Sequence, residues 1–205
     1  MTLNPQTTAL VILDGQNDFL TEGGVLYEAI QAAENGPGLK DRLNSAIAAA
    51  RSAGAAVINT RITFSEGYPE VTHNGYGIFA AVGETGGFIK GTWGSETAEG
   101  LDIENGDTVL EKHGMSAFLN PEFEKMLKER GITTLVLAGL LTDACVECTM
   151  RAAYDKGFEV YNLTDATAAL DSAKHKATVE GSYPMFAKAV TVDEFTQDLQ
   201  NRQAA

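Results

Sequence analysis

Short apolar runs alternate with amphipathic stretches along the whole chain. Six runs have the continuous apolar character of strands that are covered on both faces, at residues 9–13, 56–60, 108–110, 135–138, 159–163 and 189–191. Between and after them, apolar positions recur at helical spacing at 39–53, 122–130, 143–156, 173–181 and 192–201. This alternation predicts one α/β domain over residues 1–205, a three-layer, doubly wound (Rossmann-like) six-stranded parallel sheet with helices on both faces.

The segment 65–99 departs from this pattern. It is rich in Gly, Thr and aromatic residues, and its periodicity is weak. A loop that long inside a compact domain is usually functional, so we expect a lid or a pocket wall there. Tyr68 and Asn74 are candidates to reach a site from this segment.

Composition narrows the class of protein. A chain of 205 residues with 44% hydrophobic content is large enough for a sizeable core and is not disordered. Its formal net charge of −13 makes nucleic acid and anionic membrane surfaces poor partners, because both require clustered Lys and Arg. The chain does not begin with a leader pattern and has no bilayer-length apolar stretch, so we expect a cytoplasmic location.

A cysteine lies where a predicted strand turns into a predicted helix. Gly139 ends the run 135–138, and Thr142 or Asp143 is placed to cap the helix that follows. Cys145 therefore falls in the first helical turn, where free backbone N–H groups and the helix dipole favour thiolate over thiol. This placement predicts a nucleophile.

Two charged residues follow other strands of the predicted sheet. Asp14 comes directly after the first strand, and Lys112 comes just after the third. Ligands of open α/β sheets bind beyond the carboxyl ends of the strands, so both share an edge with Cys145. Each of the three also has an ordinary interpretation, as a turn aspartate, an exposed lysine or a small core residue.

Four short motifs follow one another along the chain, at residues 13–19 (LDGQNDF), 91–96 (GTWGSE), 112–118 (KHGMSAF) and 139–146 (GLLTDACV). The first resembles the D-x-Q-x-D-F opening of the isochorismatase-like cysteine hydrolases, the superfamily of isochorismatases, nicotinamidases and N-carbamoylsarcosine amidases. The third resembles the lysine segment of that family, and the fourth its nucleophile turn. Each motif alone is weak, but four in order at plausible spacing are specific.

The resemblance implies a catalytic triad of Asp14, Lys112 and Cys145. It also implies a cis peptide at Leu140–Leu141, which would direct the N–H groups of Leu141 and Cys145 to one point as an oxyanion hole. The implied activity is that of a metal-independent cysteine amidohydrolase without a cofactor. It would cleave a C–N bond of a small amide, ureide or carbamoyl compound through a thioester that water resolves.

The resemblance also suggests a pocket and an assembly. Phe19, Gln16, Trp93 and Phe118 are candidates to wall the substrate pocket, although large aromatic residues are as often part of a core. The expected partners are a small amide-like substrate and water. Because this family usually associates, we also expect a homo-oligomer.

The sequence lacks the metal site of the nicotinamidase branch. Residues 59–66 contain no histidine, and His73, His113 and His175 are not spaced as ligands of one metal ion. We therefore predict no metal.

Three other functions remain open. The chain could be an isochorismatase-type vinyl ether hydrolase, which would tolerate loss of Cys145, although the retained cysteine argues against it. It could be a thiol redox or sensing protein that uses Cys145 with Cys148, which lie one helical turn apart, are expected to be reduced and would form a disulfide poorly. It could also be a catalytically silent oligomeric binding protein.

Overall fold

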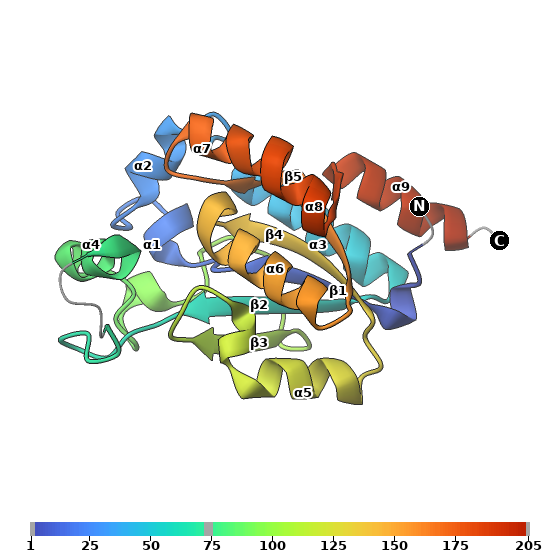
Figure 1. Cartoon of the computed structure of the whole chain (residues 1–205), viewed down its shortest axis with the longest axis horizontal. Coiled ribbons are helices and arrows are strands. Elements are labelled where there is room, and N and C mark those ends of the chain that lie inside the picture. Colours follow the sequence, from blue (N-terminus) through green and yellow to red (C-terminus); the bar gives the residue numbers. More distant parts are fainter. Residues whose placement is uncertain (1–2, 72–75, 204–205) are drawn as a thin grey trace.

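The central sheet of the computed structural model is fully parallel (Figure 1). The structure describes residues 3–71 and 76–203. Within them, six strands lie in the order β3-β2-β1-β4-β5-β6, and their bounds are β1 Thr8–Leu13, β2 Ala56–Ile62, β3 Thr108–Lys112, β4 Thr134–Leu140, β5 Glu159–Ala168 and β6 Lys188–Val190. Every residue of β1 and β4 is buried, whereas the edge strands β3 and β6 are partly exposed. The predicted doubly wound sheet is confirmed.

Helices cover both faces of this sheet. Their bounds are α1 Asn17–Leu20, α2 Tyr27–Ala32, α3 Leu39–Ala53, α4 Gly77–Thr85, α5 Pro121–Glu129, α6 Glu147–Asp155, α7 Ser172–Ala177, α8 Tyr183–Phe186 and α9 Val192–Gln203. Helices α3 and α9 pack together on one face, and α5, α6 and α8 lie on the other (Figure 1). The chain is therefore a single three-layer α/β domain. None of the helices in the described ranges is long and apolar enough to cross a membrane.

Three segments differ from the sequence prediction. The helix expected at 143–156 starts with a π-helical turn, η4 (Thr142–Val146), and the one expected at 173–181 is interrupted by another, η5 (Thr178–Ser182). The segment 65–99 contains α4 and the short turn η2 (Trp93–Ser95). Helix α4 escaped detection because Gly77–Val82 has no polar positions to reveal a helical period.

The crevice between β1 and β4 is the switch point of the topology. The connection that follows β1 crosses one face of the sheet, and the connection that follows β4 crosses the other. The two connections therefore diverge at the carboxyl ends of these strands. Leu13 pairs with Gly139 there, and Gly139 has a φ of +104°. A Cβ on Gly139 would lie 2.1 Å from the Leu13 carbonyl oxygen, so glycine lets the two strand ends approach closely.

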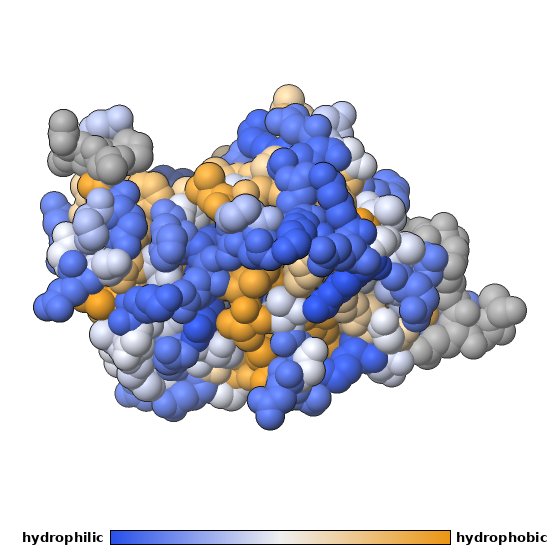
Figure 2. Space-filling view, turned by 90° about the horizontal axis from the view of Figure 1, so that it is seen from below, coloured by the Kyte–Doolittle hydropathy of each residue, from blue (hydrophilic) through white to orange (hydrophobic). Residues whose placement is uncertain are grey.

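The molecular surface reflects the acidic composition. Hydrophilic residues cover most of the face in Figure 2, and hydrophobic residues gather in a band across its middle. Large exposed hydrophobic side chains elsewhere on the described surface include Tyr76 and Ile78 at α4 and Met185 on α8. Formation of a homo-oligomer remains a prediction.

Candidate active site

Three side chains from separate elements meet at the carboxyl edge of the sheet. Asp14 directly follows β1, Lys112 is the last residue of β3, and Cys145 lies in η4 after β4. The Nζ atom of Lys112 is 2.9 Å from Oδ2 of Asp14 and 3.1 Å from Sγ of Cys145. The exposed fractions of Asp14, Lys112 and Cys145 are 0%, 1% and 5%. The fold thus assembles the cluster that the sequence suggested, and it buries that cluster.

The ammonium group of Lys112 uses all three of its donors. Besides Asp14 and Cys145, it donates to the carbonyl oxygen of Gly114 at 2.9 Å. Burial lowers the pKa of Lys112, but the Asp14 carboxylate and the Cys145 sulfur outweigh burial, so the pKa of Lys112 lies above its ordinary value. Lys112 is therefore a permanent cation at neutral pH.

The carboxylate of Asp14 is held by an unusual backbone conformation. Asp14 has a φ of +56°, a left-handed value that costs a non-glycine residue on the order of 1 kcal/mol. Its N–H donates to the Thr60 carbonyl oxygen at 2.9 Å, and its carbonyl oxygen accepts from the Gln16 N–H at 2.8 Å. Burial raises the pKa of Asp14 even though Lys112 lowers it. The buried Oδ1 has no hydrogen-bond partner in the described ranges, which leaves it available to accept a proton.

The state of the Cys145 thiol differs from the sequence prediction. The helix terminus was expected to favour a thiolate, but burial, together with the Asp14 carboxylate, raises the pKa of Cys145 well above its ordinary value despite the nearby Lys112. Burial therefore acts against the thiolate that the sequence predicted, because loss of water destabilises the sulfur anion. Attack by this sulfur needs a base, and Asp14 is in place to be one.

A cavity of about 80 Å³ opens over this cluster. Asp14 and Cys145 line it together with a mainly apolar set of residues, which are Phe19, Leu26, Ile62, Ile78, Ala81, Val82, Thr85, Phe88, Met115, Leu141, Ala144 and Leu170. The peptide bond between Leu140 and Leu141 is cis. The thiol is thus beside an open space and is not sealed within the core.

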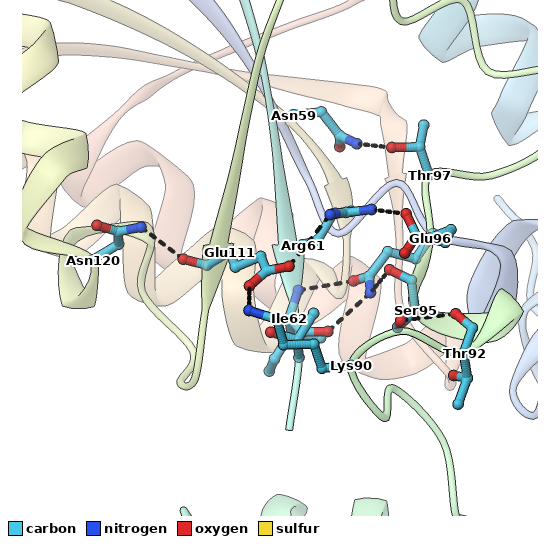
Figure 3. Close-up of polar contacts among 12 residues, drawn as sticks. Asn59, Arg61, Ile62, Lys90, Thr92, Ser95, Glu96, Thr97, Glu111 and Asn120 are labelled. Carbon is cyan, nitrogen blue, oxygen red and sulfur yellow. Dashed lines mark hydrogen bonds and ion pairs between the residues drawn. The ribbon is translucent and has the colours of Figure 1, made fainter. Parts of the chain in front are cut away.

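Of the four predicted pocket residues, only Phe19 lines this cavity. Gln16 is fully buried but points elsewhere: its Nε2 donates to the carbonyl oxygens of Ile62 and Ser95, both at 2.9 Å, and its Oε1 accepts from the Ile62 N–H at 2.8 Å. Figure 3 shows the two backbone segments that this amide joins. Gln16 therefore clamps the end of β2, where Ile62 lines the cavity, to the segment around η2.

Trp93 and Phe118 also lie away from the cavity. The ring of Trp93 is 45% exposed, and its Nε1 donates to Oε1 of Glu99 at 2.8 Å. Phe118 packs against Phe123 and Phe158, with ring centroids 4.9 and 5.8 Å apart. In the single chain, both side chains make structural contacts and neither lines the cavity. The sequence could not show this, because a motif does not reveal which way an aromatic side chain points.

Asp18 and Phe88 belong to the site but were not predicted. Oδ2 of Asp18 accepts from the Phe88 N–H at 2.6 Å, and the Phe88 ring lies 4.7 Å from the Phe19 ring between centroids. Phe88 has a φ of +60°, so this bond holds a strained backbone at the cavity wall. The sequence could have pointed to Asp18, because Asp18 lies beside Phe19 in the opening motif. No local sequence pattern pointed to Phe88.

The nucleophile turn is anchored by His175. Nε2 of His175 lies 2.7 Å from Nδ2 of Asn35, and Nδ1 lies 2.8 Å from Oγ1 of Thr142. The Asn35 amide nitrogen can only donate, so Nε2 accepts and the proton is on Nδ1, from which it is donated to Thr142. Burial lowers the pKa of His175, which favours the neutral ring that Nε2 needs in order to accept from Asn35.

The described residues include no group of three or more His, Cys, Asp or Glu side chains arranged to hold a metal ion. His73 and Asn74 lie outside the described residues. Cys145 is buried and Cys148 is exposed, and both are free thiols.

Several known proteins resemble this chain in sequence. The isochorismatase domain model matches residues 8–194. A ureidoacrylate amidohydrolase RutB from Methylorubrum extorquens is 35% identical over 173 residues, which cover 78% of this chain and 69% of that protein. The RutB protein of Agrobacterium fabrum is 30% identical over 207 residues, which cover 95% of this chain and 91% of that protein.

Solved structures also resemble this chain. A cysteine hydrolase from Pseudomonas syringae pv. phaseolicola has a TM-score of 0.84 at 22% identity, covering 98% of this chain and 96% of that chain, which is a likeness of fold. The nicotinamidase PncA of Bacillus subtilis has a TM-score of 0.73 at 26% identity, covering 90% of this chain and 99% of that chain.

Proposed function

Because this chain belongs to the isochorismatase family of hydrolases, we propose that it is a cysteine amidohydrolase that cleaves a C–N bond in small amide, ureide or carbamoyl compounds. The main observation in favour is the contact of one ammonium group, Lys112 Nζ, with both Asp14 and Cys145 at the wall of a cavity. The amidohydrolase activity named for the RutB relatives supports the reaction type.

The proposed reaction starts with proton transfer. The carboxylate of Asp14 accepts the thiol proton, and Sγ of Cys145 attacks the substrate carbonyl carbon. Lys112 stays protonated, so it stabilises the carboxylate before the transfer and the sulfur during it. The backbone N–H groups of Leu141 and Cys145 are the proposed donors to the oxygen that becomes negatively charged.

Breakdown of the tetrahedral adduct completes acylation. Asp14 returns its proton to the leaving nitrogen, the C–N bond breaks, and a thioester on Cys145 remains. Asp14 then takes a proton from water, whose oxygen attacks the thioester carbonyl carbon and releases the acid. The returning proton restores the Cys145 thiol, so the cycle needs only substrate and water.

The alternatives have less support. A vinyl ether hydrolase would not require the sulfur, yet the sulfur contacts Lys112 beside the cavity. A redox pair would require Cys145 and Cys148 to meet, yet the second thiol is exposed and the first is buried. Assembly into a homo-oligomer is part of the proposal, as is the absence of a resident metal.

The test is an ammonia-release screen over small amides, ureides and carbamoyl compounds. Wild-type protein is compared with Cys145→Ala, and Cys148→Ala is the matched control. We expect Cys145→Ala to remain folded and to lose at least about 10⁴-fold in kcat, while Cys148→Ala stays close to wild type. Intact mass should show an acyl adduct on wild-type protein and on Cys148→Ala, but none on Cys145→Ala. Undiminished hydrolysis by Cys145→Ala would refute the proposal.

A further inference from the structure

We infer that this active site selects uncharged amides or ureides with an apolar substituent and discriminates against substrates that bear a carboxylate. The inference deepens the proposed function and rests on it. It starts from the wall of the cavity over Asp14 and Cys145, which contains no Lys, Arg or His among the described residues that line it.

Outside the catalytic cluster, the described wall has one polar side chain, Thr85, and its hydroxyl group already makes hydrogen bonds within the protein. Thr85 on α4 donates its hydroxyl proton to the Val82 carbonyl oxygen at 2.7 Å and accepts from the Gly87 N–H at 3.2 Å. The rest of the wall is apolar, with side chains from α4, α1, the end of β2, the loop before α2, the nucleophile turn and the loops that carry Phe88, Met115 and Leu170. A carboxylate placed against them would lose its hydration without gaining a partner.

The nearby cations are occupied as well. Lys112 spends its three donors on Asp14, Cys145 and Gly114, as described above. Arg61, next to the cavity residue Ile62, pairs with Glu96 and Glu111 (Figure 3).

Lys90 completes this ion-pair network, because its Nζ lies 2.5 Å from Oε2 of Glu111 (Figure 3). Recognition of a carboxylate usually relies on a free guanidinium or ammonium group, and these groups already have anionic partners.

The charges that remain near the cavity are negative. Asp14 lines it, and Asp18 lies behind Phe88, whose N–H it binds. Lys112 balances the charge of Asp14, so the pair leaves no net positive charge to attract a second anion, and the Asp18 carboxylate would repel one in a site from which water is largely excluded. The same repulsion does not act on a neutral amide.

The apolar wall is also held in place. Phe88 is kept in its left-handed conformation by Asp18, and its ring packs on Phe19. The hydroxyl of Tyr68 donates to the Gly87 carbonyl oxygen at 2.8 Å and so secures the residue before Phe88. Strain that surrounding bonds maintain at a binding wall suggests that the ring has a role in selection.

This chain therefore differs from the relatives named for ureidoacrylate. An acrylate carries a carboxylate, and the described wall of this cavity has no cation for it. The described wall of this chain therefore predicts a substrate without that carboxylate.

The experiment compares matched pairs of substrates that differ in one terminal group. Hexanamide is compared with adipamate (6-amino-6-oxohexanoate), and N-butylurea with 4-ureidobutyrate, by ammonia release at neutral pH. We expect kcat/KM to be at least about 100-fold higher for the neutral member of each pair. Equal values of kcat/KM for the two members of a pair, or a higher value for the anion, would overturn the inference. This applies even if a second copy of the chain supplies the cation that the described wall lacks.

A positive charge on the wall should weaken the preference for the neutral substrate. Ala81→Arg places a guanidinium group at a lining position of α4, and Glu84→Arg places one on an exposed residue of the same helix that does not line the cavity. We expect Ala81→Arg to narrow the neutral-to-anion ratio at least about tenfold and Glu84→Arg to leave it within about twofold. An unchanged ratio in Ala81→Arg would contradict the assignment of α4 to the substrate wall.

Binding separates failure of this inference from failure of the proposed function. Calorimetric titration of Cys145→Ala with hexanamide and with adipamate measures selection without turnover. If Cys145→Ala binds hexanamide but wild-type protein does not hydrolyse it, the amidohydrolase proposal is refuted and the apolar site is supported. Hydrolysis with an anion preference would refute only the apolar site.

Discussion

The cavity has two sides that are built in different ways. Its floor consists of Asp14 and Cys145, with Lys112 behind them, at the ends of β1, β4 and β3. Its wall comes mainly from segments outside the sheet, such as α4 and the loop that carries Phe88, together with Ile62 at the end of β2. The floor is a network of charges that the strand register holds in place. The wall is apolar and is held by a few bonds to backbone groups. Under the proposed function, the sheet would supply the reacting groups and the appended segments would select the substrate.

The largest effect should come from breaking the floor. Lys112→Met removes a buried ammonium group and leaves the Asp14 carboxylate buried without its partner. We expect the free energy of unfolding to fall by about 3–5 kcal/mol and kcat to fall roughly a thousandfold. Urea denaturation and the amide assay measure the two effects. The double variant Lys112→Met/Asp14→Asn should recover part of the stability but none of the activity, and a single variant as stable as wild type would show that the ion pair is not needed for the fold.

The pH profile sharpens the role of the floor. Asp14 must be ionised to accept the thiol proton, and burial raises its pKa above the ordinary 3.8. We therefore expect kcat/KM to fall about tenfold per pH unit below a midpoint that lies above pH 3.8. The raised pKa of Lys112 predicts no loss of its charge below pH 10.5. A full kcat/KM profile checks both limits, and an acid limb centred below pH 3.8 would be inconsistent with Asp14 as the buried base.

Gln16→Ala tests the link between floor and wall. The change removes three buried hydrogen bonds and leaves the N–H and carbonyl groups of Ile62 without these partners. We expect the free energy of unfolding to fall by about 2–3 kcal/mol. KM should rise more than kcat falls, because Ile62 belongs to the wall and the Gln16 side chain makes its hydrogen bonds with Ile62 and Ser95 and not with the cluster. A drop in kcat with KM unchanged would instead place Gln16 with the catalytic groups.

Trp93→Phe should have the smallest effect. The ring is about half exposed, and its loss costs one hydrogen bond to the exposed Glu99. We expect a change in unfolding free energy within about 0.5 kcal/mol and an unchanged KM. A large rise in KM would show that Trp93 reaches substrate in the assembled protein, as its motif first suggested.

Local patterns account for much of what the sequence predicted. Continuous apolar runs identified the strands, and strand ends located Asp14, Lys112 and Cys145 at one edge because parallel strands all end there. The same reasoning failed for α4, whose uniformly apolar stretch has no period, and for the π-helical turn η4, which needs the surrounding contacts of Thr142 and His175.

The sequence by itself determined the parallel architecture and the three candidate catalytic residues, because hydrophobic periodicity and position after a strand are local properties. Only the tertiary structure decided that the Gln16 side chain joins two backbone segments, that Phe88 and α4 form part of the wall, and that burial raises the pKa of the Cys145 thiol. Each of these depends on which groups from distant segments approach one another and on how much water they exclude. Desolvation and packing are properties of the folded molecule, so no single stretch of sequence contains them.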